Sequence, residues 1–251
     1  SQGTSVKTIG SINGTAAEFQ DGSQGTVISF GIVNPHHGES VVRPEIARIK
    51  ALGLKGLKFH PVEIPAIEGM PPIQMFQNFD PADKQYDYIY KMAADSGLMI
   101  CWHMGHPLKG NYKKASPEVI AGILKRYGTI KMIAEHLGGE EWESVKKWLA
   151  EFENVFFGLS YTYPNTLVPE NDSLAILFPD NPPTHVPSKT SPALIKQAIA
   201  DVGLERFFYG DDFPYMDVGY AMAGLELLGL SELQLQAVLR DNPYRIFGIN
   251  P

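Results

Sequence analysis

The 251-residue chain has the size of one large α/β barrel or two modest domains, and its 44% hydrophobic content is ordinary for a globular protein with a large core. Its net charge of −7 argues against nucleic acid and anionic membranes as partners, because the composition offers no excess of positive charge for phosphates. The single cysteine, Cys101, excludes an internal disulfide and makes the cytoplasm the default location, and no apolar run is long enough to span a membrane.

Strands and helices are expected to alternate along most of the chain. Residues 1–25 are small and polar, and they predict an irregular segment with at most a helical piece around residues 16–20. Near-continuous apolar runs then predict six strands, at 26–33, 54–60, 98–103, 130–136, 154–160 and 206–212. Helical spacing and cap residues predict helices at 39–52, 81–96, 116–127, 140–152, 191–202, 218–228 and 231–240.

Strand–helix alternation with apolar strands is typical of a parallel sheet with right-handed crossovers. Six such units fit a doubly wound sheet or six-eighths of a barrel, and we treat residues 1–251 as one domain. Two long loops, at 61–80 and 161–190, interrupt the alternation and are rich in proline and aromatic residues. Loops of this length inside a compact domain usually have a function, so we expect them to select the substrate.

Polar residues stand where the predicted strands end. His60, His103 and His136 each occupy the last position of a strand, and Asp212 occupies the equivalent place after the sixth. Imidazole and carboxylate groups that meet at one end of a parallel sheet are the ligand set of Zn²⁺ and related ions. The alternative is that each histidine is a polar plug. Asp211 competes with Asp212, because neighbouring strand residues face opposite sides.

Further residues could line the same site. Lys58, near the end of its strand, is either a buried base or carboxylate partner or a solvated cation, and we assign substrate binding to it together with His60, His106 and Tyr161. Glu135 is expected to face away from His136 because side chains alternate along a strand. Cys101 is expected in the core rather than as a nucleophile. Arg245 is expected to anchor the last helix on a carboxylate or carbonyl.

Several motifs together resemble the amidohydrolase-related branch of the metal-dependent hydrolase superfamily. This branch includes aminocarboxymuconate semialdehyde decarboxylase and related decarboxylases, lactonases and hydratases. The resemblance covers about residues 26–249 and depends on the order and spacing of five segments: Gly56-Leu-Lys-Phe-His-Pro61, Cys101-Trp-His-Met-Gly105, Ala134-Glu-His-Leu-Gly-Gly139, Tyr209-Gly-Asp-Asp-Phe-Pro214 and Asn242-Pro-Tyr-Arg-Ile-Phe247.

The resemblance implies a (β/α)₈ TIM barrel with one metal ion at the carboxyl ends of its strands. In such enzymes, residues matching His103 and Asp212 bind the ion, and the residue matching His136 holds or activates the water. Asp212 would also shuttle a proton. Asn242 and Arg245 match the C-terminal signature. We expect Zn²⁺, with Mn²⁺ as the other candidate, because histidine-rich ligation favours zinc.

One feature of the family is missing from the sequence. Its first strand ends in His-x-His, and no such pair occurs here. By this comparison the strand at 26–33 is the third of the barrel, and the first one or two β/α units, about 50–80 residues, are expected to be absent from the chain. We therefore expect either a preceding piece or pairing with another chain, with a homodimer as the commonest assembly.

These observations favour a metal-dependent hydrolase or decarboxylase that acts on a small carboxylated or cyclic substrate. One alternative is a metal-free barrel enzyme that uses His136, Asp212 and Lys58 as acid/base groups. The other is a catalytically inactive relative that binds ligands, for which the missing His-x-His is the best support.

Metal analysis of purified protein tests the ligand assignment. His103→Ala and Asp212→Ala should each lower the bound zinc or manganese, because each removes a donor from the ion. Unchanged metal content together with unchanged activity in both variants would contradict the metal-site prediction.

Overall fold

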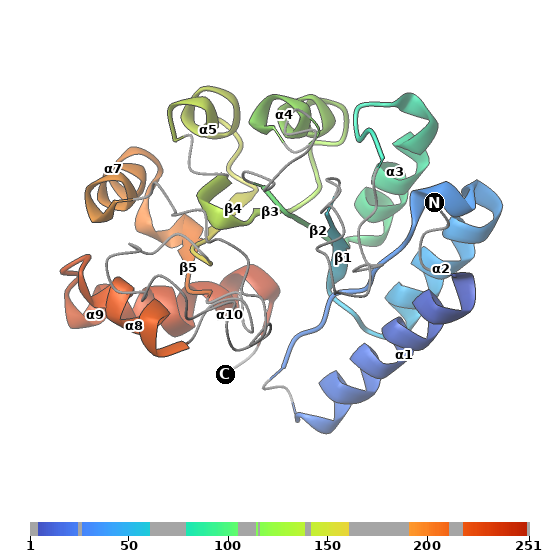
Figure 1. Cartoon of the computed structure of the whole chain (residues 1–251), viewed down its shortest axis with the longest axis horizontal. Helices are drawn as coiled ribbons and strands as arrows, with labels where there is room; N and C mark the ends of the chain where they lie inside the picture. The colour runs from blue at the N-terminus through green and yellow to red at the C-terminus, as the bar shows by residue number, and fades with distance from the viewer. Residues whose placement is uncertain are drawn as a thin grey trace, which may run out of the picture. The chain divides into compact units, whose positions relative to one another are not determined.

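The computed structural model describes residues 5–24, 27–60, 79–104, 114, 116–138, 142–160, 191–210 and 218–249. Within these residues, five strands form one sheet in the order β1-β2-β3-β4-β5 (Figure 1). They are β1 (Gly56–Phe59), β2 (Met99–Trp102), β3 (Met132–Ala134), β4 (Val155–Gly158) and β5 (Phe207–Phe208). Pairing is parallel between β1 and β2 and between β4 and β5, which confirms the predicted α/β class.

Helices alternate with the strands as predicted. In the described parts of the chain the α-helices are α1 (Val6–Gly22), α2 (Glu39–Ala51), α3 (Asp87–Ser96), α4 (Pro117–Arg126), α5 (Trp142–Leu149), α7 (Pro192–Val202), α8 (Val218–Glu226), α9 (Glu232–Gln236) and α10 (Asn242–Phe247). Ser116 and Ser191 cap α4 and α7 by accepting backbone N–H bonds, as the Ser-Pro starts indicate. None of the described helices combines the length and apolar character that crossing a bilayer requires.

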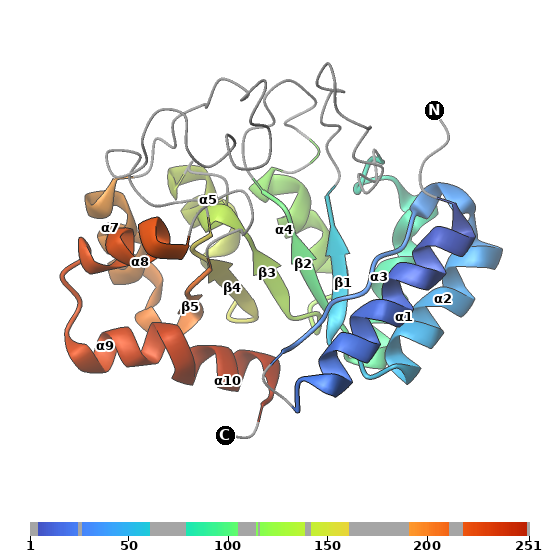
Figure 2. The ribbon, with the colours of Figure 1, turned by 60° about the horizontal axis from the view of Figure 1, so that its bottom comes forward.

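The chain forms two compact units. The first comprises residues 1–133 with 152–155, and the second comprises residues 134–151 with 156–251. In the first unit, α1 and α2 lie side by side, and α3 packs against α2 and β2 (Figures 1 and 2). In the second unit, α10 packs against β5 and against η7 (Ala237–Asp241), a π-helical segment that continues α9. The predicted closing helix therefore extends beyond residue 240.

Helix α1 corrects the prediction that residues 1–25 are irregular, and the helical piece expected around residues 16–20 is confirmed as part of this longer helix. The side chain of Asn13, which is fully buried, accepts from the Ile32 N–H at 2.8 Å and donates to the Ile32 carbonyl at 2.9 Å. Gln20 accepts from the Ser29 N–H at 3.0 Å. The Gly, Ser and Thr residues of this segment have a weak intrinsic helix propensity, which is why the sequence predicts an irregular segment. The tertiary hydrogen bonds outweigh that propensity and favour the helix.

The predicted strand at 26–33 is wrong as a regular strand. Among its described residues, only Gly31 forms a bridge, which is parallel to Leu57. The Gly31 N–H donates to the Gly56 carbonyl at 2.9 Å, and the Lys58 N–H donates to the Gly31 carbonyl at 2.8 Å. The segment therefore runs beside β1, while side chains of α1 bond its other edge. Such cover keeps an edge from pairing with further strands.

Buried aromatic side chains fill the first unit beside β1 and β2. The ring of Phe59 lies 5.6 Å from that of Phe79 and 5.5 Å from that of Trp102, measured between centroids. The Tyr90 hydroxyl, on α3, donates to the Pro81 carbonyl at 3.1 Å. Burial raises the pKa of Tyr90 well above its ordinary value, so this hydroxyl stays protonated and remains a donor.

Close pairing of β1 with β2 depends on a glycine. A Cβ atom added at Gly56 would lie 2.3 Å from the Met99 carbonyl oxygen and 2.6 Å from the Phe30 ring. The carbonyl belongs to the neighbouring strand and cannot withdraw without disturbing the parallel register. Position 56 therefore has room for a hydrogen and not for a methyl group.

The C-terminal signature residues anchor β5 within the second unit. The buried Asn242 side chain donates to the carbonyls of Leu204 and Phe207, each at 2.9 Å. The Arg245 guanidinium donates to the Glu205 carbonyl. The prediction that Arg245 anchors the last helix through a carbonyl is therefore confirmed. Together the two residues bind the chain on either side of the point where β5 begins.

Two glycine substitutions should change stability in opposite directions. Gly56→Ala should lower the free energy of unfolding by about 1–3 kcal/mol, because the methyl group meets backbone atoms of β2. Gly122→Ala in α4 meets nothing within 4 Å and should raise it by about 0.5–1 kcal/mol, because alanine is the better helix former. Urea unfolding of both variants measures this, and equal effects would contradict the close-packing argument.

Asn242→Asp should destabilise the chain more than Asn242→Ala. Alanine leaves two buried carbonyls without their donor, at about 1–3 kcal/mol, whereas aspartate adds an acceptor that faces both. Urea midpoints of the two variants, compared with the parent, provide the measurement. A fully stable Asn242→Asp variant would show that the amide donor is not needed.

Candidate active site

In the first unit, His60 and His103 follow directly after β1 and β2. The parallel register pairs Phe59 with Trp102, so the next residue of each strand comes side by side. The His103 N–H donates to the Phe59 carbonyl at 2.9 Å, which continues the pairing by one step. The two imidazole rings stack with centroids 3.7 Å apart and planes at 21°. Strand pairing thus brings a predicted metal ligand, His103, against a predicted substrate-binding residue, His60.

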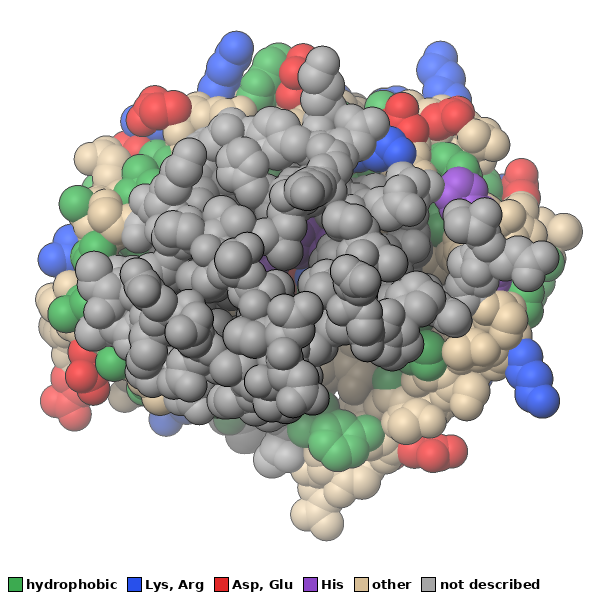
Figure 3. Space-filling model, in the orientation of Figure 1, with side chains coloured by type: hydrophobic (Ala, Val, Ile, Leu, Met, Phe, Trp, Pro, Cys, Tyr) green, Lys and Arg blue, Asp and Glu red, His purple; other side chains and the backbone are tan. Residues whose placement is uncertain are grey.

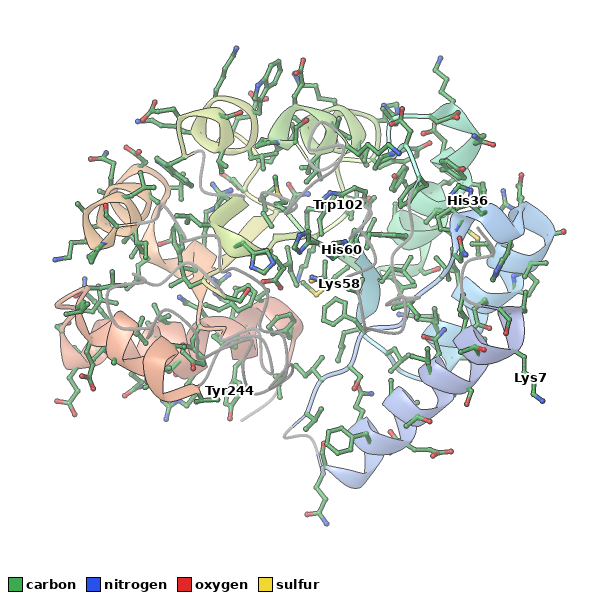
Figure 4. All side chains as sticks on the ribbon, in the orientation of Figure 1. Lys7, His36, Lys58, His60, Trp102 and Tyr244 are labelled. Carbon is green, nitrogen blue, oxygen red and sulfur yellow. The ribbon has the colours of Figure 1, made fainter. Side chains whose placement is uncertain are left out.

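Lys58 and Cys101 lie two residues before His60 and His103 along β1 and β2. They are direct partners in the β1–β2 register, and the Lys58 ammonium contacts the Cys101 sulfur at 3.5 Å. Cys101 is buried, as expected for a core residue, and Lys58 is half-buried. Figure 4 shows Lys58 and His60 close together at β1, whereas His36 lies apart from them beside α2. A lysine and two histidines at adjoining strand ends can together attract an anionic group.

In the second unit, His136 follows β3 and is held by a backbone carbonyl. Its Nδ1 lies 2.9 Å from the Ser160 carbonyl oxygen, and its side chain is buried. A carbonyl can only accept, so Nδ1 carries the proton in this contact, and the lone pair of the neutral ring lies on Nε2. The backbone of His136 and Leu137 takes positive φ angles of 57° and 53°. Two consecutive non-glycine residues in this region are uncommon and are characteristic of functional sites.

Glu135 lies beside His136 rather than on the opposite side of the strand, which corrects the alternation argument. The Ser160 hydroxyl donates to the Glu135 carboxylate at 2.8 Å and lies 3.1 Å from Nδ1 of His136. Alternation fails because β3 ends at Ala134 and the chain then turns into the left-handed region. Ser160, which no motif singled out, connects the two side chains. The sequence signal that could have identified Ser160 is its position at the carboxyl end of a strand, two residues after β4.

Two glycines make room for this cluster. A Cβ atom at Gly158 would lie 2.3 Å from the Glu135 carboxylate, and one at Gly210 would lie 3.0 Å from Cβ of Ser160. Gly158 ends β4, and Gly210 stands two residues after β5. The carboxylate thus rests directly on the β4 backbone, where any larger residue would displace it.

Several predicted site residues lie outside the described residues. They are Asp211, Asp212, His106 and Tyr161. Chain connectivity alone locates Asp212, which comes four residues after the end of β5. Within the described ranges, no group of three His, Cys, Asp or Glu side chains is placed to hold a metal ion.

The donor chemistry of His136 nevertheless fits a metal. Histidines that bind metals usually donate their other ring N–H to a carbonyl or carboxylate, which fixes the ring and its tautomer. The bond between Nδ1 and the Ser160 carbonyl provides this fixation. Imidazole suits zinc, and a carboxylate such as Asp212 suits manganese as well. The predicted ligands are therefore chemically suited to either ion.

Charged side chains of both signs are interspersed on the part of the surface that Figure 3 shows in colour. On the face drawn in Figure 3, the Lys, Arg, Asp and Glu side chains of the described residues alternate around the outside rather than gathering by sign.

Comparison with solved structures shows a TIM-barrel-like fold. An uncharacterised TIM-barrel protein from Bordetella bronchiseptica matches with a TM-score of 0.68 at 13% identity, over 94% of this chain and 72% of its own. A dihydroxybenzoic acid decarboxylase from Polaromonas, solved with manganese and the inhibitor 2-nitroresorcinol, matches with 0.67 at 14% identity, over 98% and 76%. The 5-carboxyvanillate decarboxylase of Sphingomonas paucimobilis matches with 0.67 at 16% identity, over 98% and 75%.

The sequence itself matches no curated protein. It does match the sequence model of the amidohydrolase family over residues 7–249. Because this match spans nearly the whole chain, the protein belongs to the amidohydrolase family.

Proposed function

We propose that this protein is a metal-dependent hydrolase or decarboxylase that acts on a small carboxylated or cyclic organic substrate. The observation that carries the proposal is His136, a buried imidazole with its Nδ1 held by the Ser160 carbonyl at the end of β3, in a chain of the amidohydrolase family. An imidazole that is fixed in orientation and tautomer is suited to acid/base chemistry or to ligation.

His103 and Asp212 are the residues that would hold the metal, as the resemblance implies, and His136, at another strand end, is the third candidate ligand. When bound, a divalent ion lowers the pKa of its water toward about 7 and polarises substrate oxygens. Zinc is our first choice, and manganese, which a structurally similar decarboxylase contains, is the second.

His136 and Asp212 are proposed as the acid/base groups. Where His103 and Asp212 hold the ion without His136, Nε2 of His136 can take a proton from water or deliver one to a substrate carbon. In decarboxylation such a proton replaces the departing carboxyl group, and in hydrolysis the same nitrogen takes a proton from the attacking water. Asp212 would exchange the proton with His136 or with the substrate.

Substrate binding is proposed for Lys58, His60, His106 and Tyr161. Lys58 and His60 supply positive or hydrogen-bonding groups at the end of β1, which is what a substrate carboxylate requires. His106 and Tyr161 would contribute from the loops that follow β2 and β4. Two of the structurally similar enzymes are named for carboxylated aromatic substrates, which favours decarboxylation as the first reaction to test. We propose a cytoplasmic location and a homodimer.

An activity screen with matched variants tests the proposal. Purified protein loaded with Zn²⁺ or Mn²⁺ should release CO₂ from hydroxylated benzoates or hydrolyse cyclic esters, and exhaustive chelation should abolish the activity. His136→Gln should lower kcat by at least about 100-fold, because a positioned acid/base group contributes about 10²–10⁴-fold. His37→Gln, in the turn before α2, serves as the control and should retain full activity.

Two outcomes would favour the alternatives instead. Activity that survives chelation but is lost in His136→Gln would indicate a metal-free acid/base enzyme. Tight binding of an aromatic carboxylate without turnover or metal would indicate an inactive relative. Full activity of His136→Gln would contradict the proposal itself.

A further inference from the structure

Glu135 and Ser160 form a hydrogen-bonded chain that ends on His136. The Glu135 carboxylate lies 2.8 Å from the Ser160 hydroxyl oxygen, and this oxygen lies 3.1 Å from Nδ1 of His136. The Ser160 carbonyl lies 2.9 Å from the same nitrogen. Nδ1 of His136 therefore lies near both the carbonyl and the hydroxyl oxygen of Ser160. Of these two, the hydroxyl can either donate or accept a hydrogen bond, and Glu135 contacts the hydroxyl.

The direction of the hydroxyl proton follows from the chemistry of its neighbours. A carboxylate can only accept, so the Ser160 hydroxyl donates to Glu135 and turns a lone pair toward Nδ1. The carbonyl at 2.9 Å also can only accept. Both partners of Nδ1 thus require a proton on that nitrogen. Without Glu135 the hydroxyl could rotate and donate to Nδ1 instead, which favours the opposite tautomer.

The surrounding backbone is shaped to admit the carboxylate. Gly158 is the residue on which the Glu135 carboxylate rests, since a Cβ there would lie 2.3 Å from one of its oxygens. His136 itself is held at a φ of 57°, in the left-handed region that non-glycine residues seldom adopt. A strained histidine and a glycine that accommodates its neighbour indicate that this arrangement is specified by the fold.

We propose that Glu135 and Ser160 are positioning residues that hold His136 as the Nδ1–H tautomer, which places the lone pair of the ring on Nε2. The consequence for catalysis rests on the proposed function, whereas the tautomer can be measured without any activity. Glu135 and Ser160 would affect the reaction only through His136.

The tautomer is measured directly by long-range ¹H–¹⁵N correlation of protein labelled with ¹⁵N-histidine. Spectra are recorded at pH 8, where imidazole is ordinarily neutral, before and after chelation. The His136 signal is assigned by its absence in His136→Gln. Parent protein should show Nδ1–H in both spectra, because Ser160 and not a metal fixes the ring. An Nε2–H tautomer in the chelated parent protein would overturn the proposal.

Two variants disturb the carboxylate by different means. Glu135→Gln removes the obligate acceptor, and Gly158→Ala pushes an intact carboxylate away with a methyl group. Both should increase the Nε2–H population and lower kcat/KM by about 10–100-fold, the usual effect of losing such an outer partner. Glu143→Gln on α5, where the side chain is exposed, is the control and should leave both readouts unchanged.

The outcomes separate this proposal from the proposed function. If Glu135→Gln folds and leaves both the tautomer and kcat/KM unchanged, Glu135 has no positioning role. If the tautomer changes as expected but His136→Gln keeps full activity, the positioning chain stands and the proposed function fails. If neither disturbing variant folds, an Nε2–H tautomer in the chelated parent protein would still overturn the proposal.

Discussion

Parallel pairing of short buried strands is the constraint on which the rest of the structure depends. In the first unit the register of β1 with β2 pairs Phe59 with Trp102. The next residue of each strand, His60 and His103, therefore lies beside the other, and their rings stack. In the second unit the pairing of β4 with β5 continues when the Leu159 N–H donates to the Phe208 carbonyl at 3.1 Å. This bond fixes the backbone of Leu159 and so positions the next residue, Ser160. Residues distant in sequence thus acquire common neighbours because strands of one direction end together.

The second determinant is the turn after β3. The strand stops at Ala134, and the chain passes through two left-handed residues, His136 and Leu137. A regular strand would send Glu135 and His136 to opposite faces. The turn brings both to Ser160 instead, and it does so in a buried place, where a hydrogen bond that fixes an imidazole is worth more than it is in water. Position and tautomer of His136 are therefore properties of the backbone as much as of the side chain.

Much of the architecture could be predicted from the sequence, because apolar runs and Ser-Pro caps are local signals. Helix α1 could not, since the hydrogen bonds of Asn13 and Gln20 that favour it join residues about 9–19 positions apart and leave no local pattern. The regular strand predicted at 26–33 is absent for a related reason. Asn13 and Gln20 of α1 bond to backbone groups of this segment, and these contacts between distant residues cannot be seen in the local sequence. For the site, strand-end positions of His60 and His103 follow from their apolar runs. The roles of Glu135 and Ser160 do not, since a change in backbone handedness is not visible as periodicity.

The account centres on His136, whose Nδ1 is held by Ser160 so that the lone pair of the ring lies on Nε2. The most direct test is a crystal of this protein grown with zinc and measured at the zinc absorption edge. The account predicts an anomalous peak on the Nε2 side of His136, either bound directly at about 2.0–2.1 Å or with one water molecule between them, and Nδ1 still bonded to the Ser160 carbonyl. Zinc bound on Nδ1, or a fully occupied zinc site that His136 contacts neither directly nor through a water molecule, would contradict it.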